Sequence, residues 1–165
     1  MMRALALVVL LTGCADSPDN ARITNASTRP GSNGLELVLT QQIELTQAMR
    51  EALDHGIALR LVYRIDSCGH QRQRALWLRH APLKRQYELW HEGASEVRDF
   101  ARLSGLEAAL DRVRLPLDLP IDARCDGQVE VRLDLAALPT PLRFPAFFQP
   151  QQWRLRSATF HWSET

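Results

Sequence analysis

The chain has 165 residues, and its 20 basic and 19 acidic side chains give a formal net charge of +1. Nucleic acid is excluded as the main partner, because binding a phosphate backbone needs clustered positive charge. Length and apolar content suffice for one domain with one hydrophobic core.

The first thirteen residues have the order of a secretory signal: Arg3, an apolar run over 4–11, then small residues before Cys14. The run is too short to cross a bilayer, which takes about 20 residues. Residues 11–14 have the pattern of a lipobox, in which the Cys14 thiol receives a lipid and the preceding residues are removed. We therefore expect a palmitate-type lipoprotein anchor at Cys14. The alternative is an ordinary signal with a chance cysteine.

The residue after Cys14 is Ala15 rather than aspartate, which favours the outer membrane by analogy with lipoprotein sorting. Residues 15–34 are rich in Ser, Asn, Asp, Pro and Gly, which is typical of a flexible tether, here spanning about 25 Å. The predicted organisation is a signal over 1–13, a lipidated cysteine and tether over 14–34, and a globular domain over 35–165. The domain would be held on the membrane and face the periplasm.

Alternating apolar residues predict the first strand over 35–40. Helical spacing over 45–53, with Thr46 as cap and Gly56 after the end, predicts a short helix. The alternation over 57–65 predicts a strand with one buried and one solvated face. Two return strands follow over 74–80 and 86–91.

Ser104 and Glu107 have the spacing of a capping box and predict a second helix, with Leu106, Leu110 and Val113 on one face. Prolines 116 and 120 would end that helix and border a loop. Residues 129–135 alternate cleanly and predict another strand.

Four prolines over 138–150 predict an irregular segment, followed by a final strand over 153–162. The phenylalanines Phe144, Phe147 and Phe148 and nearby Trp153 have two interpretations: an exposed contact surface or a lid on one end of the core. The sum is a mainly-β α+β fold, an antiparallel sheet or β-sandwich of about six or seven strands with two short helices.

Cys68 and Cys125 remain once Cys14 is assigned to lipid. An even pair in an oxidising compartment predicts a disulfide, since both residues lie at strand ends. Two buried free thiols and a metal pair are the alternatives. A zinc site is weakly indicated, because neither cysteine has a C-x-x-C partner.

Motifs of the common enzyme classes are missing from the sequence: there is no G-x-S-x-G, H-E-x-x-H, Walker loop or dinucleotide fingerprint. His80 and His91 would form a zinc site only if their strands paired in a suitable register. Asp66, Ser67 and His70 are close in sequence, but a polar turn explains them, and catalysis requires spatial geometry. We expect no catalytic residues, no metal site and no cofactor.

Trp77 and Trp90 are out of phase with the neighbouring apolar positions and so are predicted to point outward. They are accompanied by Arg74, Arg79 and Arg85, and exposed tryptophan beside arginine is common at protein interfaces. These five residues are the candidate interface. The alternative is a sheet covered on both faces, with the tryptophans in a second core layer.

The chain resembles the proteobacterial exported-protein family catalogued as domain of unknown function 4390. The resemblance rests on segments 45–59, 83–87, 106–110, 131–135 and 138–142 and on the terminal Trp153 and Trp162. It implies export, assigns no activity or catalytic residue, and associates the family with sensor-kinase genes. The lipobox and the Cys68/Cys125 pair depart from the family pattern. These departures concern the lipid anchor and the disulfide and leave the expected fold unchanged.

The preferred function is therefore a non-catalytic envelope lipoprotein that serves as a binding or accessory module for another envelope protein, with a link to signalling. A carrier of a small apolar ligand is the main alternative, and an enzyme of unrecognised type is the third. A deep apolar cavity would favour the carrier, whereas a flat face bearing tryptophan would favour the binding module.

Overall fold

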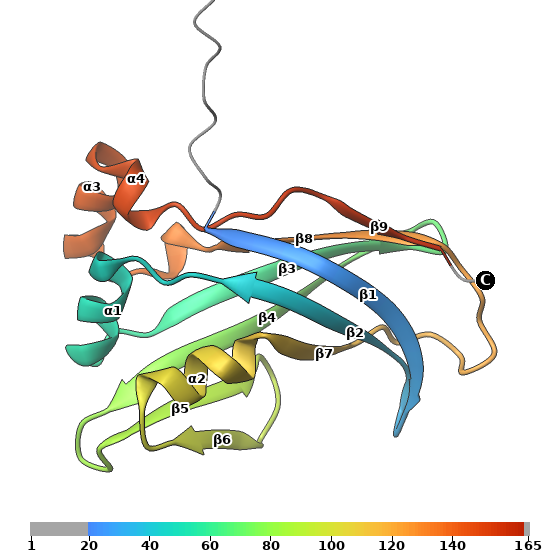
Figure 1. Ribbon diagram of the computed structural model, residues 1–165, viewed down its shortest axis with the longest axis horizontal. Helices are drawn as coiled ribbons and strands as arrows, with labels where there is room; N and C mark the ends of the chain where they lie inside the picture. The colour runs from blue at the N-terminus through green and yellow to red at the C-terminus, as the bar shows by residue number, and fades with distance from the viewer. Residues whose placement is uncertain (1–19, 164–165) are drawn as a thin grey trace, which may run out of the picture.

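A computed structural model describes residues 20–163, so the signal over 1–13 and Cys14 lie outside the described residues. Within 20–163, nine strands form two antiparallel sheets that face each other (Figure 1). The three-stranded sheet has the order β1 (Ala21–Gly31), β2 (Gly34–Ile43) and β7 (Arg112–Pro116). The six-stranded sheet has the order β6 (Val97–Phe100), β5 (Gln86–His91), β4 (His70–Ala81), β3 (Leu59–Ser67), β8 (Gly127–Leu133) and β9 (Phe160–Trp162).

Short helices gather around the sheets. They are α1 (Gln47–Asp54), α2 (Leu103–Leu110), α3 (Thr140–Phe148), α4 (Pro150–Trp153) and the 3-10 turn η1 (Leu135–Ala137). Figure 1 shows α1, α3 and α4 together at one end of the sheets, while α2 packs beside β5 and β7. No helix among the described residues has the length and apolarity needed to cross a bilayer.

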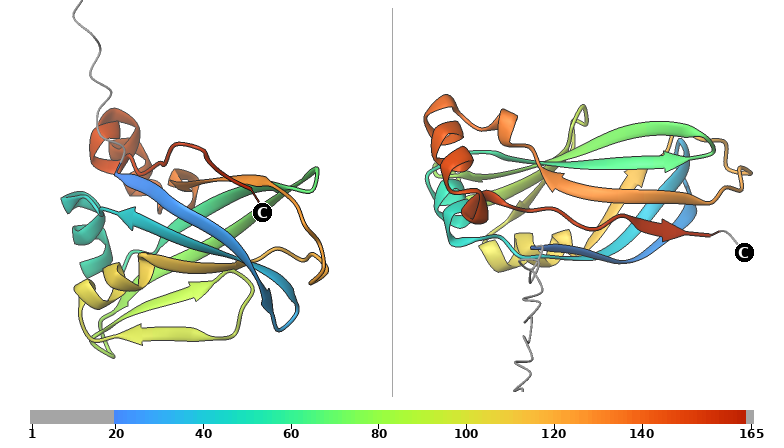
Figure 2. Two further views of the ribbon diagram at one scale, coloured as in Figure 1. Left: turned by 45° about the vertical axis from the view of Figure 1, so that its right-hand side comes forward. Right: turned by 90° about the horizontal axis from the view of Figure 1, so that it is seen from above.

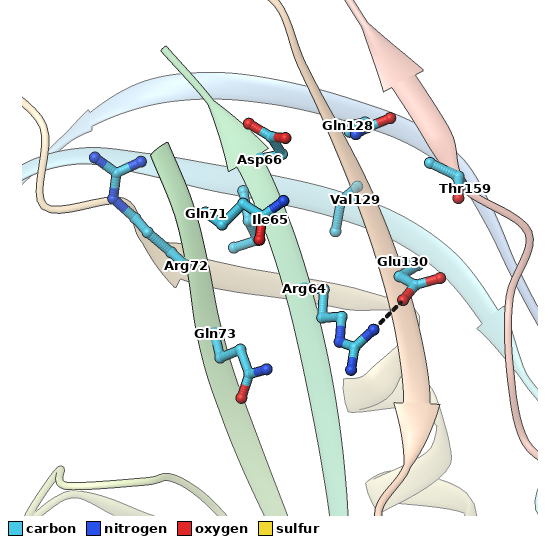
Figure 3. A pocket seen from close by; sticks show the side chains of 10 residues that line it. All are labelled: Arg64, Ile65, Asp66, Gln71, Arg72, Gln73, Gln128, Val129, Glu130 and Thr159. Atoms are coloured by element: carbon cyan, nitrogen blue, oxygen red, sulfur yellow. Dashed lines mark ion pairs between the residues drawn. The ribbon is translucent and has the colours of Figure 1, made fainter. Parts of the chain in front are cut away.

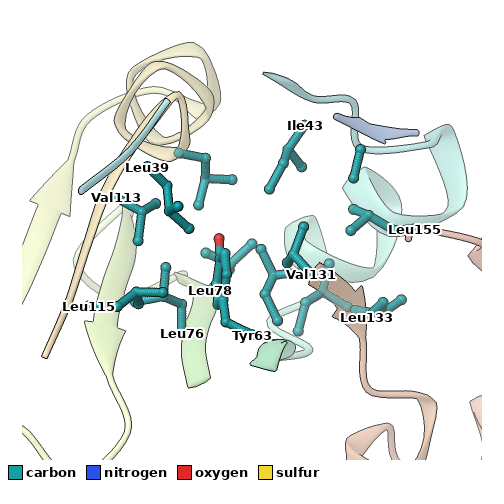
Figure 4. Close-up of a cluster of buried hydrophobic side chains, with 14 of the residues drawn as sticks. Leu39, Ile43, Tyr63, Leu76, Leu78, Val113, Leu115, Val131, Leu133 and Leu155 are labelled. Carbon is teal, nitrogen blue, oxygen red and sulfur yellow. The ribbon is translucent and has the colours of Figure 1, made fainter. Parts of the chain in front are cut away.

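The core lies between the two sheets, where alternate residues of facing strands point inward (Figure 4). Leu37 and Leu39 of β2 and Leu61 and Tyr63 of β3 are completely buried. Full burial of side chains of this size contributes roughly 1.5–3 kcal/mol each. This shared apolar layer is why the clean alternation over 35–40 and 57–65 correctly predicted strands.

One polar contact joins the sheets inside this layer. Gln41 of β2 donates hydrogen bonds from Nε2 to the Tyr63 hydroxyl and to the Leu110 carbonyl, both at 2.8 Å. Burial raises the pKa of Tyr63 far above its ordinary value, so the hydroxyl stays neutral. Gln41 thereby ties β2, β3 and α2 together at one point.

The mainly-β antiparallel architecture is confirmed, as is the helix capped by Thr46, whose Oγ1 accepts from the Met49 amide at 3.3 Å. The predicted tether is wrong where it covers β1, which pairs along its length with β2 through a turn between Gly31 and Gly34. Its apolar alternation is hidden because the register shifts between Ile23 and Asn25. That shift puts the next buried residue at Ala26, out of phase with Ile23. The domain therefore includes β1 from Ala21 onward and does not start at residue 35.

The predicted capping box is also wrong. Arg102 precedes the first turn of α2, Ser104 lies inside the helix, and no side chain caps it. Val113 belongs to β7 rather than to the helix, because Val113 and Leu115 pair with β2 and alternate into the core. Two inward positions in a five-residue strand are too few to establish a period in the sequence.

The segment predicted to be irregular contains α3 and α4 instead. Pro141 and Pro150 lie in the first turns of these helices, where the missing amide hydrogen breaks no helical bond. Most of the predicted final strand is extended chain. Regular pairing is limited to β9, with one further bridge between Arg156 and Arg132.

The predicted disulfide is present. It joins Cys68, in the turn between β3 and β4, to Cys125, just before β8, with their Cα atoms 5.3 Å apart. Cys125 precedes the first residue of β8, whereas η1 and α3 follow its last residue, so the bridge lies at the end of that strand opposite α3. It closes a loop with a sequence separation of 57.

Replacing both cysteines, as Cys68→Ser/Cys125→Ser, is expected to lower the free energy of unfolding by about 4 kcal/mol, because the unfolded chain regains the entropy of the open loop. Urea unfolding of the oxidised protein measures this difference. Adding reductant should reproduce the loss in the wild type and leave the double variant unchanged. Equal stability of the two oxidised proteins would contradict the bracing role.

Gly127, the first residue of β8, has no room for a side chain. A Cβ atom there would overlap the Trp162 ring and lie 2.7 Å from the Asp66 carbonyl oxygen. Gly127→Ala is therefore expected to destabilise the protein by about 2 kcal/mol, measured by thermal unfolding. Gly105→Ala is the matched control, since a Cβ in α2 meets only ordinary contacts with Phe100 at 3.5 Å or more and alanine favours a helix. The control should be neutral or stabilising.

Candidate functional site

The outer face of the six-stranded sheet carries a row of large side chains. The registers place Trp77 of β4 directly between Arg60 of β3 and Trp90 of β5. Their chain neighbours Leu76 and Leu78 are buried in the core, so the row points the opposite way. No described helix lies over this face (Figure 2).

The two tryptophans stack, with ring centroids 6.1 Å apart and an interplanar angle of 7°. The guanidinium of Arg60 lies 5.8 Å from the Trp77 ring centroid, and that of Arg79 lies 5.5 Å from the Trp90 centroid. Both rings are partly exposed. We call these four residues the aromatic row. It is neither freely solvated nor covered by a second layer of protein.

Arg60 is fixed at one end of the row by two carboxylates. Its guanidinium donates to both Glu92 oxygens, at 3.0 and 2.7 Å, and to Asp134 at 2.7 Å. The indole nitrogen of Trp77 donates to the same Glu92 at 3.3 Å. The hydrogen bonds from Arg60 hold the pKa of Glu92 below its ordinary value and raise that of Arg60 in return.

Arg79 is held at the other end by Glu88, whose side chain is only 2% exposed. Glu88 accepts from the Nε of Arg79 at 3.1 Å and from the Nζ of Lys84 at 2.8 Å. Hydrogen bonds from Lys84 first, and then from Arg79, lower the pKa of Glu88 despite its burial. The carboxylate is therefore charged at neutral pH and keeps Arg79 over Trp90.

The predicted interface set is corrected in two places. Arg74 points to the other side of the sheet, where its Nε donates to the Pro116 carbonyl at 2.8 Å and its guanidinium pairs with Asp118. Arg85 lies in the exposed turn between β4 and β5, away from the row. Of the three predicted arginines, only Arg79 contacts a tryptophan. Arg60, rather than the predicted Arg74, contacts Trp77. Arg60 was missed because contact across strands depends on register.

A polar groove of about 620 Å³ lies further along the same face (Figure 3). Arg64 of β3 points toward Glu130 of β8, with 3.5 Å between the charged atoms. The polar residues that line the groove around them are Asp66, Gln71, Arg72, Gln73, Gln128 and Thr159. Such a lining offers hydrogen bonds to a polar partner beside the apolar side chains of Ile65 and Val129.

The hollows with a larger share of apolar lining are smaller. One of about 350 Å³ lies along the seam between β1 and β9, lined by Ala21, Ile23 and Phe160 among others. Another, beside the disulfide, has only about 10 Å³. The space between the sheets is filled by the core itself, so a deep apolar cavity of the size a carrier uses is not found among residues 20–163.

The other candidate residues are not brought together. His80 pairs with Tyr87 and His91 pairs with Leu76, so the two histidines are four positions apart along the hairpin. Within 20–163, no three metal-ligating side chains converge.

The polar turn at Asp66, Ser67 and His70 forms no proton relay. The Ser67 hydroxyl accepts from Arg72 at 3.4 Å, and the His70 ring lies 2.8 Å from the Cys68 carbonyl. Asp66 is part of the groove lining. These contacts tie the side chains of Ser67 and His70 to the turn and its neighbouring strand.

Glu88→Gln is expected to cost about 2 kcal/mol at pH 7, because the charge that holds Arg79 and Lys84 is lost. Since the folded protein lowers the pKa of Glu88, this contribution is present above the ordinary value of 4.5 and disappears as pH falls below it. The stability difference between wild type and variant should shrink between about pH 5 and about pH 3, the range in which carboxyl groups titrate. Urea unfolding at several pH values checks this, with the exposed Glu96→Gln as control.

Comparison with known proteins identifies a family. No curated protein and no solved structure matches the chain. The family described as Domain of unknown function (DUF4390) matches residues 18–163, which include every strand and helix described above. The chain therefore belongs to the DUF4390 family.

Proposed function

We propose that this protein is a lipoprotein of the bacterial cell envelope, anchored through Cys14 and facing the periplasm, on the outer membrane. The lipobox pattern over 11–14 supports the anchor. The Cys68–Cys125 disulfide supports an oxidising compartment, because such bonds persist outside the cytosol.

We further propose that it works as a non-catalytic binding or accessory module for another envelope protein, through the face that bears the aromatic row. The carrying observation is the stacked pair of Trp77 and Trp90 held between two arginines on an uncovered sheet. Tryptophan and arginine are the residues most enriched among those that dominate binding energy at protein interfaces. A link to signalling remains part of the proposal, carried by the family resemblance alone.

The geometry suits binding because the row is ordered before any partner arrives. Glu92 and Asp134 fix Arg60, and Glu88 fixes Arg79, so little side-chain freedom is left to lose. The polar groove beside the row supplies hydrogen-bonding groups of the kind found at an interface rim. A flat aromatic centre and a polar surround favour a protein partner over an apolar small molecule.

The test compares partner capture by chemical crosslinking in intact envelopes. Trp77→Ala/Trp90→Ala should reduce recovery of the specific partner at least about tenfold, as expected for two residues at the centre of an interface. Trp77→Phe/Trp90→Phe keeps aromatic surface and should recover part of the binding. Ile121→Ala, an exposed apolar position in the loop between β7 and β8 and outside both the row and the groove, is the control. Equal recovery by the wild type and the alanine variant would overturn the interface.

The anchor has a separate test. Cells supplied with an alkyne-bearing palmitate should label the wild-type protein and leave Cys14→Ser unlabelled, since no other residue offers the lipobox thiol. Labelling of both proteins, or of neither, would contradict the anchor without touching the interface.

A further inference from the structure

Helix α3 exposes three phenylalanines on one side. Phe144, Phe147 and Phe148 are 66%, 74% and 82% exposed. Their spacing of three and four residues places them on one helical face. The opposite face carries Leu142 and the buried Ala146, which pack against the core. We call the three exposed residues the Phe face.

The Phe face is not a lid on the core. Trp153 of α4 and the following Leu155 are both buried and fill that end of the core beneath the helices. The phenylalanines are therefore left outside a complete core. Three large apolar side chains gathered on one short helix are typical of a contact surface.

The beginning of the described chain lies at the same end of the molecule. Asn20 donates from its side-chain amide to the Arg154 carbonyl, at 3.0 Å, just after α4. Its own carbonyl accepts from the Glu44 amide at 2.9 Å. Figures 1 and 2 show β1 starting beside the chain that leaves α4. Since α3 packs against α4, the first strand begins at the end of the molecule that carries the Phe face.

Covalent geometry limits how far this end can stand from an anchor at Cys14. Five residues lie between Cys14 and Asn20, and six fully extended steps along the chain span at most about 22 Å. This maximum distance between Cys14 and Asn20 follows from chain length alone. A lipid on Cys14 would therefore keep the α3 end of the domain at or near the headgroups.

The segment that carries the Phe face has no negative charge of its own. Residues 140–153, which include α3 and α4, contain Arg143 and no acidic residue, whereas α1 at the same end carries Glu51 and Asp54 beside Arg50. Basic residues near a bilayer are attracted to anionic lipid headgroups, and aromatic side chains settle at the boundary between headgroups and acyl chains.

We propose that the Phe face of α3 binds the lipid surface beside the anchor, with Phe144, Phe147 and Phe148 in the interfacial layer. This inference rests on the lipid anchor proposed above. The anchor and the Phe face together give two points of attachment. The helical end of the domain lies on the membrane, and the end with the disulfide points away from it.

Photo-crosslinking of the lipidated full-length protein tests the contact. The protein carries Phe147→benzoylphenylalanine and is reconstituted in vesicles of phosphatidylethanolamine and phosphatidylglycerol. The matched control is Ile121→benzoylphenylalanine, an exposed apolar position in the loop between β7 and β8, at the far end of the domain. The probe at 147 should form lipid adducts several-fold more often than the probe at 121.

Each other result overturns the proposal. Equal lipid labelling at both positions, or no adduct at 147, excludes a specific membrane contact. Adducts at 147 with a second copy of the chain or with another envelope protein assign the Phe face to a protein. The mass of Cys14 in the same sample separates the two proposals: a lipidated protein without adducts refutes only the Phe face, and an unlipidated one refutes the anchor and the arrangement built on it.

Hydrogen exchange supplies a second measurement on the same full chain. Residues 140–153 should exchange more slowly in the vesicle-bound protein than in the unlipidated protein in buffer without vesicles, and β1 and β2 should not change. Phe144→Ser/Phe147→Ser/Phe148→Ser should abolish the protection of α3. The substituted side chains are exposed, so circular dichroism should show the fold intact. Protection that persists in this variant would overturn the proposal.

Discussion

The structure depends on burying one face of each of two sheets of unequal size. The inner side chains of β2 and β3, with Leu39 and Tyr63 at the centre, form an apolar layer that both sheets share. A three-stranded sheet cannot cover a six-stranded one. The remaining apolar surface needs other cover, and α1, α2 and α4 supply it with Met49, Leu106 and Trp153. The positions of the helices therefore follow from the mismatch between the sheets.

The same mismatch leaves the outer face of the six-stranded sheet open to solvent. Side chains on that face must be compatible with water and also held in place. The strand register does both by placing charged side chains next to the aromatic rings. Trp77 and Trp90 share one row with Arg60, and carboxylates on neighbouring strands and loops hold the arginines. A surface of this kind is rigid and still partly exposed. That combination is what the proposed binding role uses.

The sequence predicted those parts of the fold in which a single periodicity runs uninterrupted. The alternation of β3 and the capped helical spacing of α1 are long enough to be recognised without knowing which elements they pack against. The bulge after Ile23 breaks the alternation of β1, so the sequence did not predict that strand. Because β7 is short, Val113 was assigned to the preceding helix. The disulfide was predicted because an even number of cysteines remained in a protein expected in an oxidising compartment. The outward phase of the tryptophans followed from alternation, but Arg60 did not, because lateral neighbours are set by strand pairing that no local pattern encodes.

The disulfide also changes what a protease can accomplish. Its covalent loop contains β4 and β5, and so both tryptophans, together with the turn at Leu83, which is fully exposed. Exposed turns are preferred sites of nicking. A single cut at that turn leaves both strands covalently joined through Cys68 and Cys125, and the sheet pairing can hold the cut ends in place. The binding face would then survive damage that releases fragments from an unbridged protein, and reduction rather than cleavage would decide its lifetime.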